Sequence, residues 1–197
     1  MHVKKSTLKI AGIIFAAAAA VVAAAFILSH ILGNQGNEVL IQTNMGNITV
    51  QLYPDKAPIT VQNFEDYVKS GFYDGTVFHR VVKGFVIQGG GFTANGTQKP
   101  TNSPIQLESD NGLPNAKYTI AMARTSNPNS ATSQFFINTA DNTFLNYGPG
   151  NPGYAVFGKV VSGFGVVDAI NNVPVETKYG MQDWPVSNVV IEKAGRL

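Results

Sequence analysis

The 197-residue sequence contains no cysteine, one tryptophan and three histidines, and His79 is the only histidine after residue 37. The absence of cysteine excludes a disulfide scaffold, a thiolate nucleophile and any Cys-ligated zinc or iron–sulfur site. His79 is the only candidate base for a serine hydrolase, and the sequence has no Gly-x-Ser-x-Gly elbow to accompany it. One histidine and dispersed carboxylates also show no ligand spacing of a metal site. We therefore expect no metal and no cofactor.

Charged residues are also scarce, at 13% of the chain, and the positive ones are unevenly placed. Before Glu38 the only charges are Lys4, Lys5 and Lys9, which leaves 11 Lys and Arg against all 12 Asp and Glu in the remainder. The positive net charge of +2 therefore comes from the extreme N-terminus, and the remainder of the chain is close to neutral. Because the remainder has no run of positive charge, we do not expect it to bind nucleic acid.

Residues 1–9 form a basic segment, and residues 10–32, which follow it, are strongly apolar. The uncharged stretch at 10–28 would span about 28 Å as a helix, close to the thickness of a bilayer core. Two interpretations remain open: an uncleaved membrane anchor, or a signal peptide with a cleavage site at Ala23 and Ala25. In both cases the lysines predict that the C-terminal part of the chain lies outside the cytoplasm.

Residues 33–37 are polar and rich in glycine and asparagine, which is typical of a short linker, and residues 38–197 are long enough for one complete domain. Within this domain, β-rich runs alternate with turn residues, and two segments have helical periodicity. The expected strands are 39–43, 48–53, 77–82, 85–88, 118–124, 133–139, 154–161 and 187–193, and the expected helices are 57–70, with Thr60 as a candidate N-cap, and 164–170. Eight strands and two helices favour an antiparallel β-barrel or sandwich.

The segment Phe78–Gly90 is unusual because it places a cation and an amide among phenylalanines. Arg80 and Gln88 are separated by a tight turn, so two antiparallel strands would bring their side chains together. Placing a guanidinium on an apolar wall costs free energy unless its hydrogen-bond donors find acceptors. These acceptors could belong to a ligand or to backbone carbonyls of the protein, and both interpretations stay open here. The glycines 89–91 lack the Lys-Ser/Thr of a phosphate loop, and we expect them to form a turn with close backbone packing.

Together with Phe78–Gly90, three further segments resemble the cyclophilin-type peptidyl-prolyl cis–trans isomerases. They are Ala121-Met122-Ala123-Arg124, Ser133-Gln134-Phe135-Phe136-Ile137-Asn138 and Val156-Phe157-Gly158-Lys159-Val160, in the order of the family. The resemblance covers nearly all of residues 38–197 and is nearest to the exported, periplasmic bacterial members. It implies a mostly β fold, an eight-stranded antiparallel barrel capped by two helices, here preceded by an N-terminal hydrophobic helix.

The resemblance also implies a site for proline-containing peptides. Arg80 is similar to the family's catalytic arginine, which hydrogen-bonds near the prolyl nitrogen, and Gln88 is similar to the glutamine that holds this arginine. Phe85, Val86, Phe136 and Leu145 would line the proline pocket, His79 and Gln134 would flank it, and Ala123, Arg124 (through its backbone), Phe144 and Tyr154 would contact the rest of the substrate. The implied reaction is rotation about X–Pro bonds by preferential binding of the twisted amide.

Three positions depart from the eukaryotic pattern of the family. Val86 stands where methionine is common, Tyr154 where many members have histidine, and Phe144 where a tryptophan N–H binds the drug cyclosporin. Because phenylalanine has no donor, we expect isomerase activity to be preserved and cyclosporin binding to be weak.

The expected partners are unfolded proteins and proline-containing peptides, and also the membrane if residues 10–32 are not cleaved. The expected location is the periplasmic side of the inner membrane, where the protein would assist folding, and the expected state is a monomer. Two other functions remain open. One is a chaperone-like module that binds proline peptides with little catalysis, and the other is a barrel that binds small molecules or sugars.

Overall fold

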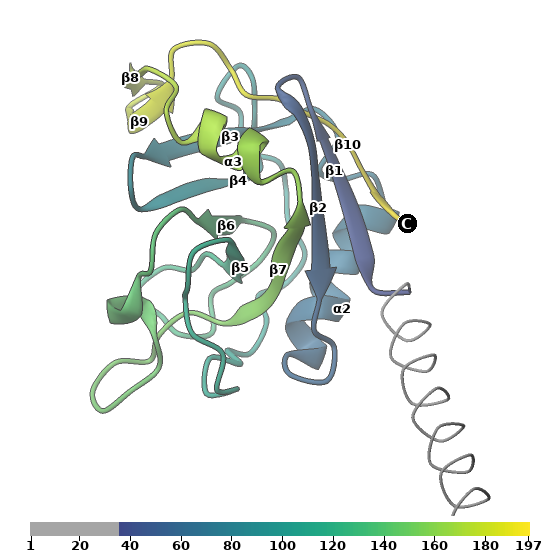
Figure 1. The fold of residues 1–197 in the computed structure, drawn as a ribbon, viewed down its shortest axis with the longest axis vertical. Helices are drawn as coiled ribbons and strands as arrows, with labels where there is room; N and C mark the ends of the chain where they lie inside the picture. Colours follow the sequence, from purple (N-terminus) through teal and green to yellow (C-terminus); the bar gives the residue numbers. More distant parts are fainter. Residues whose placement is uncertain (1–35) are drawn as a thin grey trace, which may run out of the picture. The chain divides into compact units, whose positions relative to one another are not determined.

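Eight antiparallel strands curl into a nearly closed barrel, against which two helices pack (Figure 1). The computed structural model describes residues 36–197, so the expected basic segment and the anchor or signal lie outside the described residues. The strands of the barrel are β1 (Glu38–Thr43), β2 (Gly46–Leu52), β3 (Thr76–Val82), β4 (Val86–Thr93), β5 (Thr119–Met122), β6 (Phe135–Asn138), β7 (Val156–Ser162) and β10 (Ile191–Arg196); the helices are α2 (Pro58–Lys69) and α3 (Phe164–Ile170), with a 3-10 turn η1 (Thr143–Leu145). The expected mostly β fold is confirmed.

The strand order β10-β1-β2-β7-β5-β6-β4-β3 places segments from both ends of the described chain next to each other. The edge strands meet where the Phe78 N–H of β3 donates to the Val189 carbonyl at 2.9 Å and the Gly75 N–H donates to the Ile191 carbonyl at 2.8 Å. These bonds occupy backbone groups that an open sheet edge would present to other chains.

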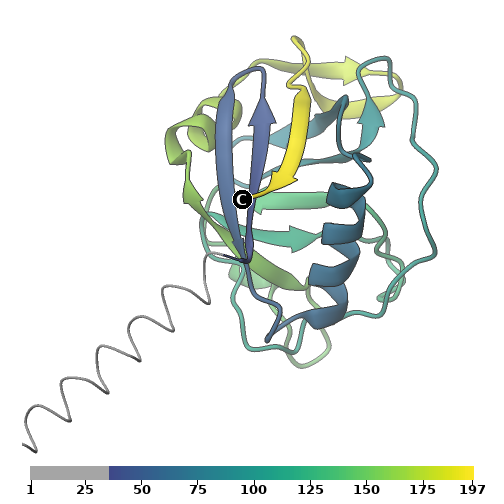
Figure 2. The ribbon, with the colours of Figure 1, turned by 90° about the vertical axis from the view of Figure 1, so that its right-hand side faces the viewer.

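The helix α2 buries one face against the barrel (Figure 2). Val61, Phe64 and Val68 share this face, as the helical periodicity predicted, and all three are buried. The Phe64 ring lies 5.6 Å from the Phe135 ring and 5.1 Å from the Phe157 ring, so an aromatic cluster joins the helix to β6 and β7. Within residues 36–197, no helix is long and apolar enough to cross a membrane.

The start of α2 differs from the prediction. Ala57 occupies the N-cap position, and Thr60 lies inside the helix, where its N–H and its hydroxyl both donate to Oε2 of Glu108 at 2.8 Å and 2.7 Å. Glu108 therefore supplies the negative charge that favours a helix N-terminus, and it does so from a segment far along the chain. The expectation of Thr60 as the N-cap was wrong because the cap came from a long-range contact.

The three glycines 89–91 do not form the expected turn, because they lie inside β4. Their close backbone packing is confirmed at Gly90, which has a φ of +81°. A Cβ atom at Gly90 would lie 2.8 Å from the Tyr73 ring and 2.9 Å from the Phe135 ring. The register between β3 and β4 shifts at this point, which indicates a bulge in the strand rather than a reversal of the chain.

A second, two-stranded sheet was not predicted. It consists of β8 (Val175–Lys178) and β9 (Met181–Pro185), and β9 packs against β3 (Figure 1). The two turn residues, Tyr179 and Gly180, have φ values of +54° and +77°, as a tight hairpin turn of primed type requires. Because β8 is largely exposed, it lacks the apolar alternation by which a strand is recognised in a sequence.

Candidate active site

A pocket of about 220 Å³ opens on the wall of the barrel, beside β3, β4, β6 and η1. It is lined by Arg80, Phe85, Val86, Gln88, Ala123, Arg124, Phe136, Leu145 and Tyr154. All nine are residues that the resemblance assigned to the site, although they come from segments between β3 and the start of β7. The barrel therefore gathers them in one hollow.

The floor of this pocket is apolar and separate from the main core. Val86, Ala121, Phe136 and Val156 form a small buried cluster, against which Phe85, Ala123, Leu145 and Tyr154 pack. Gln88 of β4 pairs with Phe136 of β6, so a polar side chain stands directly beside the apolar floor. The result is an apolar slot with polar groups along one edge.

Arg80 and Gln88 form a cross-strand pair of β3 and β4, as the tight turn between them predicted. Nη1 of Arg80 lies 3.5 Å from Oε1 of Gln88, and the guanidinium carbon lies 5.9 Å from the centre of the Phe85 ring. Gln88 Nε2 in turn donates to Oε1 of Gln134 at 2.9 Å. Among residues 36–197, no group accepts a hydrogen bond from Nη2 of Arg80, so this arginine retains donors for a ligand.

The other arginine of the pocket, Arg124, already donates its hydrogen bonds to groups of the protein. Nε and Nη2 of Arg124 donate to the Gly153 carbonyl at 3.0 Å and 2.7 Å, and Nη1 donates to the Thr125 carbonyl at 2.8 Å. The guanidinium carbon also lies 4.4 Å from the centre of the Tyr154 ring. The side chain of Arg124 is thus bound by its own protein, and it shapes the wall of the pocket.

His79 does not line the pocket. Its side chain is buried, with the ring 4.7 Å from that of Phe92 and 6.0 Å from that of Trp184. Burial lowers the pKa of His79 to about 4, and the charge of Arg80 adds to this effect, while hydrogen bonds to the backbone and to Gln134 oppose it. His79 is therefore neutral at physiological pH and lies behind the site.

Gln134 and Phe144 also lie outside the lining of the pocket. Gln134 borders an adjoining hollow of about 300 Å³, which shares Gln88, Ala123 and Arg124 with the pocket. Phe144 is 66% exposed, and its ring stacks on Phe85 at 5.5 Å with an interplanar angle of 24°. It therefore extends the apolar rim of the site toward solvent.

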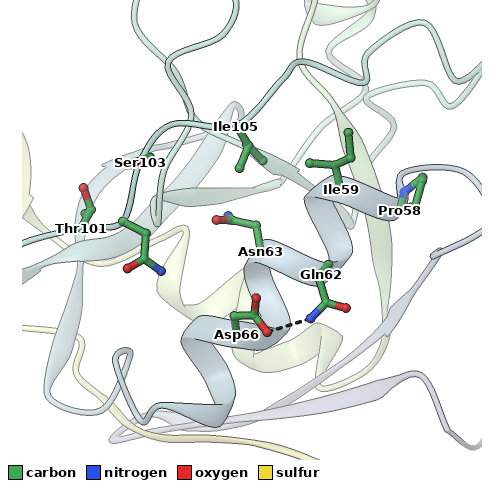
Figure 3. A pocket seen from close by; sticks show the side chains of 9 residues that line it. Pro58, Ile59, Gln62, Asn63, Asp66, Thr101, Ser103 and Ile105 are labelled. Atoms are coloured by element: carbon green, nitrogen blue, oxygen red, sulfur yellow. Dashed lines mark hydrogen bonds between the residues drawn. The ribbon is translucent and has the colours of Figure 1, made fainter.

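A larger hollow of about 890 Å³ lies between α2 and residues 101–105 (Figure 3). Amide, hydroxyl and aliphatic side chains line it, and its one charged side chain, Asp66, accepts a hydrogen bond from Gln62 at 2.7 Å. The hollow contains no cation, and its one carboxylate already accepts a hydrogen bond from Gln62, so it shows no arrangement that points to catalysis. In the part of the chain that the structure describes, no group of three or more His, Cys, Asp or Glu is arranged to hold a metal ion.

One charged neighbour of the pocket was missed by the sequence analysis. Oδ2 of Asp183 lies 4.0 Å from Nε of Arg80. Asp183 belongs to β9, in the hairpin that was not predicted, and a single acidic residue in a polar stretch gives no signal of its position.

Comparison with known proteins assigns the chain to a family. Residues 38–196 match the family model described as "Cyclophilin type peptidyl-prolyl cis-trans isomerase/CLD". A peptidyl-prolyl cis-trans isomerase of Acinetobacter baylyi is 59% identical over 79% of this chain and 81% of its own, and peptidyl-prolyl cis-trans isomerase B of Escherichia coli is 50% identical over 78% and 96%. A crystal structure of a Cryptosporidium parvum cyclophilin, in the presence of the dipeptide Ala-Pro, is similar with a TM-score of 0.68 and 28% identity, over 81% of this chain and 98% of that one. Since one family accounts for almost all of the described chain in sequence and in fold, the protein belongs to the cyclophilin-type peptidyl-prolyl cis–trans isomerases and is an enzyme of that class.

Proposed function

We propose that the pocket catalyses rotation about X–Pro bonds by binding the twisted amide more tightly than either planar isomer. The barrier to rotation, about 18–20 kcal/mol, arises because the nitrogen lone pair is delocalised into the carbonyl group. When the bond is twisted, the lone pair returns to the nitrogen, which becomes a better hydrogen-bond acceptor. A fixed donor aimed at this nitrogen therefore stabilises the transition state and not the ground states.

The observation that supports this mechanism most directly is the contrast between the two arginines of the pocket. The donors of Arg124 are taken by backbone carbonyls, whereas Arg80 keeps Nη2 free of protein partners among the described residues. Arg80 is thus the cation that can donate to a prolyl nitrogen. Its bond to Gln88 is long at 3.5 Å, and catalytic hydrogen bonds of this kind often tighten only in the complex with substrate.

The remaining lining residues would hold the peptide around the twisting bond. The apolar floor at Val86 and Phe136 offers a dry slot for the pyrrolidine ring, because both side chains are buried and carry no polar atoms. The polar edge at Gln88, with the backbone near Ala123, would bind the peptide groups on either side. The related Cryptosporidium parvum cyclophilin was crystallised in the presence of Ala-Pro, which is consistent with a proline-containing ligand here.

Isomerisation and binding of a proline peptide by Arg80 variants test this mechanism. In Arg80→Ala the isomerisation rate should fall by about 100-fold, since a buried or preorganised donor to a transition state contributes this much or more. Binding of the peptide, followed by NMR titration, should change far less. Lys83→Ala removes an exposed cation from the neighbouring turn and should isomerise at the wild-type rate. An Arg80→Ala variant as fast as the wild type would exclude Arg80 as the catalytic donor, and a wild type no faster than the uncatalysed peptide would indicate a binding module with little catalysis.

We also propose that the enzyme is exported and assists the folding of proteins on the periplasmic side of the inner membrane as a monomer. The lysines before residue 10 and the apolar stretch at 10–32 support export, either with an anchor or with a cleaved signal. Mass spectrometry of the mature N-terminus and fractionation of the membranes separate these two forms. Recovery of the full-length chain from the cytoplasmic fraction would contradict export.

A further inference from the structure

The ion pair between Arg80 and Asp183 joins two parts of the fold that no local pattern connects. Oδ2 of Asp183 lies 4.0 Å from Nε of Arg80, and the two side chains are 40% and 39% exposed. An exposed pair of this kind adds little to stability. Its importance therefore depends on what it does to the orientation of the guanidinium.

The backbone around Asp183 is arranged in an unusual way. Glu176 pairs with Trp184 and Lys178 pairs with Met181, with a shift of register between the two pairs, so β9 carries one residue more than β8 and Asp183 lies in the bulge. Asp183 also has a φ of +59°, in the left-handed region that most residues other than glycine, asparagine and aspartate avoid. Bulges of this type turn a side chain to a new direction and are frequent beside active sites.

The hairpin that carries Asp183 is held firmly in place by the next residue. Trp184 is fully buried, its ring lies 6.0 Å from His79 and 6.3 Å from Phe92, and its Nε1–H donates to Oδ1 of Asn188 at 2.9 Å. Asn188 in turn donates to a backbone carbonyl at 3.0 Å. Because Trp184 is fixed, the carboxylate that precedes it is held beside β3.

We propose that Asp183 is a positioning residue, which orients the Arg80 guanidinium through a different nitrogen from the one that Gln88 approaches. The two partners engage different nitrogens: Asp183 lies by Nε and Gln88 lies by Nη1, which leaves Nη2 to the substrate. A carboxylate beside Nε and an amide oxygen beside Nη1 both attract the planar guanidinium, so together they favour one orientation of it. This inference rests on the proposed role of Arg80 as the donor to the prolyl nitrogen.

The Asp183→Asn variant tests the proposal, because asparagine keeps the size of the side chain and tolerates the left-handed backbone. We expect kcat to fall by about threefold to fivefold, the range that an exposed ion pair can supply, with KM nearly unchanged. The midpoint of unfolding should not change. The Nε–Hε resonance of Arg80 in ¹⁵N NMR should shift, and Asp183→Glu should recover part of the rate.

Glu176→Gln is the matched control, because it removes an exposed ion pair, that with Lys178 at 3.6 Å, from the strand that pairs with β9. It should leave both the rate and the Arg80 resonance unchanged. In an Arg80→Ala background, Asp183→Asn should cause no further loss. Wild-type kcat and an unshifted resonance in Asp183→Asn would overturn the proposal, and so would an equal loss in both backgrounds. A wild-type rate in Arg80→Ala would remove the proposed function and this role together.

Discussion

The amide of Gln88 donates to Oε1 of Gln134 at 2.9 Å, and this hydrogen bond turns the carbonyl end of Gln88 toward Arg80. An isolated glutamine has two orientations of its amide, and only one presents an acceptor to the arginine. Gln134 thus selects the useful orientation from outside the pocket. The same Gln134 also contacts the buried His79. Two polar side chains outside the pocket, Gln134 and His79, therefore pack next to the residues that line it.

Replacing Gln88 with leucine should slow isomerisation by about tenfold, because a hydrogen bond to a charged group is worth about 1.5–3 kcal/mol and this one is long. Gln134→Leu should slow it less, since the carbonyl of Gln88 would still reach Arg80 part of the time. The rates are measured on a proline peptide, and thermal unfolding verifies that both variants are folded. A Gln134→Leu variant slower than Gln88→Leu would contradict this order.

The stability of the protein should fall at mildly acidic pH because of His79. Burial lowers the pKa of His79 from 6.5 to about 4, so between these values the unfolded chain binds a proton that the folded chain does not. The free energy of unfolding is then highest above pH 6.5 and decreases as the pH falls to about 4, by about 3 kcal/mol in total. Urea unfolding from pH 4 to pH 8 measures this slope. In His79→Gln the slope should be shallower, and parallel curves for the two proteins would exclude His79 as its source.

The isomerisation rate should be nearly flat from about pH 6 to pH 9. Arginine keeps its charge throughout this range, and His79 is already neutral at its lower end. The rate is followed on one proline peptide in buffers of constant ionic strength. A sigmoidal profile centred near 6.5 would instead indicate that a histidine takes part as an acid or base.

The predictions from sequence succeeded where a feature depends on neighbours along the chain. The turn between β3 and β4 was sufficient to place Arg80 opposite Gln88, and the spacing of Val61, Phe64 and Val68 was sufficient to orient α2. The family resemblance named residues from distant segments, and nine of them line one pocket, although their roles in binding and catalysis stay predictions.

Features that depend on distant segments were missed. The cap of α2 comes from Glu108, and the carboxylate beside the site comes from Asp183 in an exposed hairpin. His79 was expected to flank the site, but its position in β3 turns the ring toward Phe92 and Trp184. In each case the partner is set by how the barrel closes, and periodicity and turn residues do not contain this information.

Cyclosporin should bind the wild type weakly, and Phe144→Trp should tighten binding by about fivefold. Phe144 is exposed and stacked on Phe85, so an indole in its place would have room and its N–H would supply one hydrogen bond, worth about 1 kcal/mol. Inhibition of isomerisation by the drug measures the change. Phe144→Leu, which adds no donor, should not bind more tightly, and nanomolar inhibition of the wild type would contradict the prediction.

Two glycines of β3–β4 offer a comparison between backbone strain and steric overlap. Gly84 and Gly90 both have positive φ values, +71° and +81°. At Gly84 a Cβ atom would have no neighbour within 4 Å, whereas at Gly90 it would lie 2.8 Å from the Tyr73 ring and 2.9 Å from the Phe135 ring. Alanine at either position would therefore carry the backbone strain of a positive φ, but only alanine at Gly90 would also overlap with neighbouring rings.

Gly84→Ala should lower the free energy of unfolding by about 1 kcal/mol, the cost of a left-handed alanine. Gly90→Ala should lower it by about 3 kcal/mol, because two fixed aromatic rings must also move. Chemical unfolding of both variants gives these values. Gly90 lies two residues after Gln88, so displacement of β4 should also slow isomerisation in Gly90→Ala and not in Gly84→Ala. Equal loss of stability in the two variants would mean that the two rings move without cost, and equal isomerisation rates would mean that the bulge in β4 does not fix the position of Gln88.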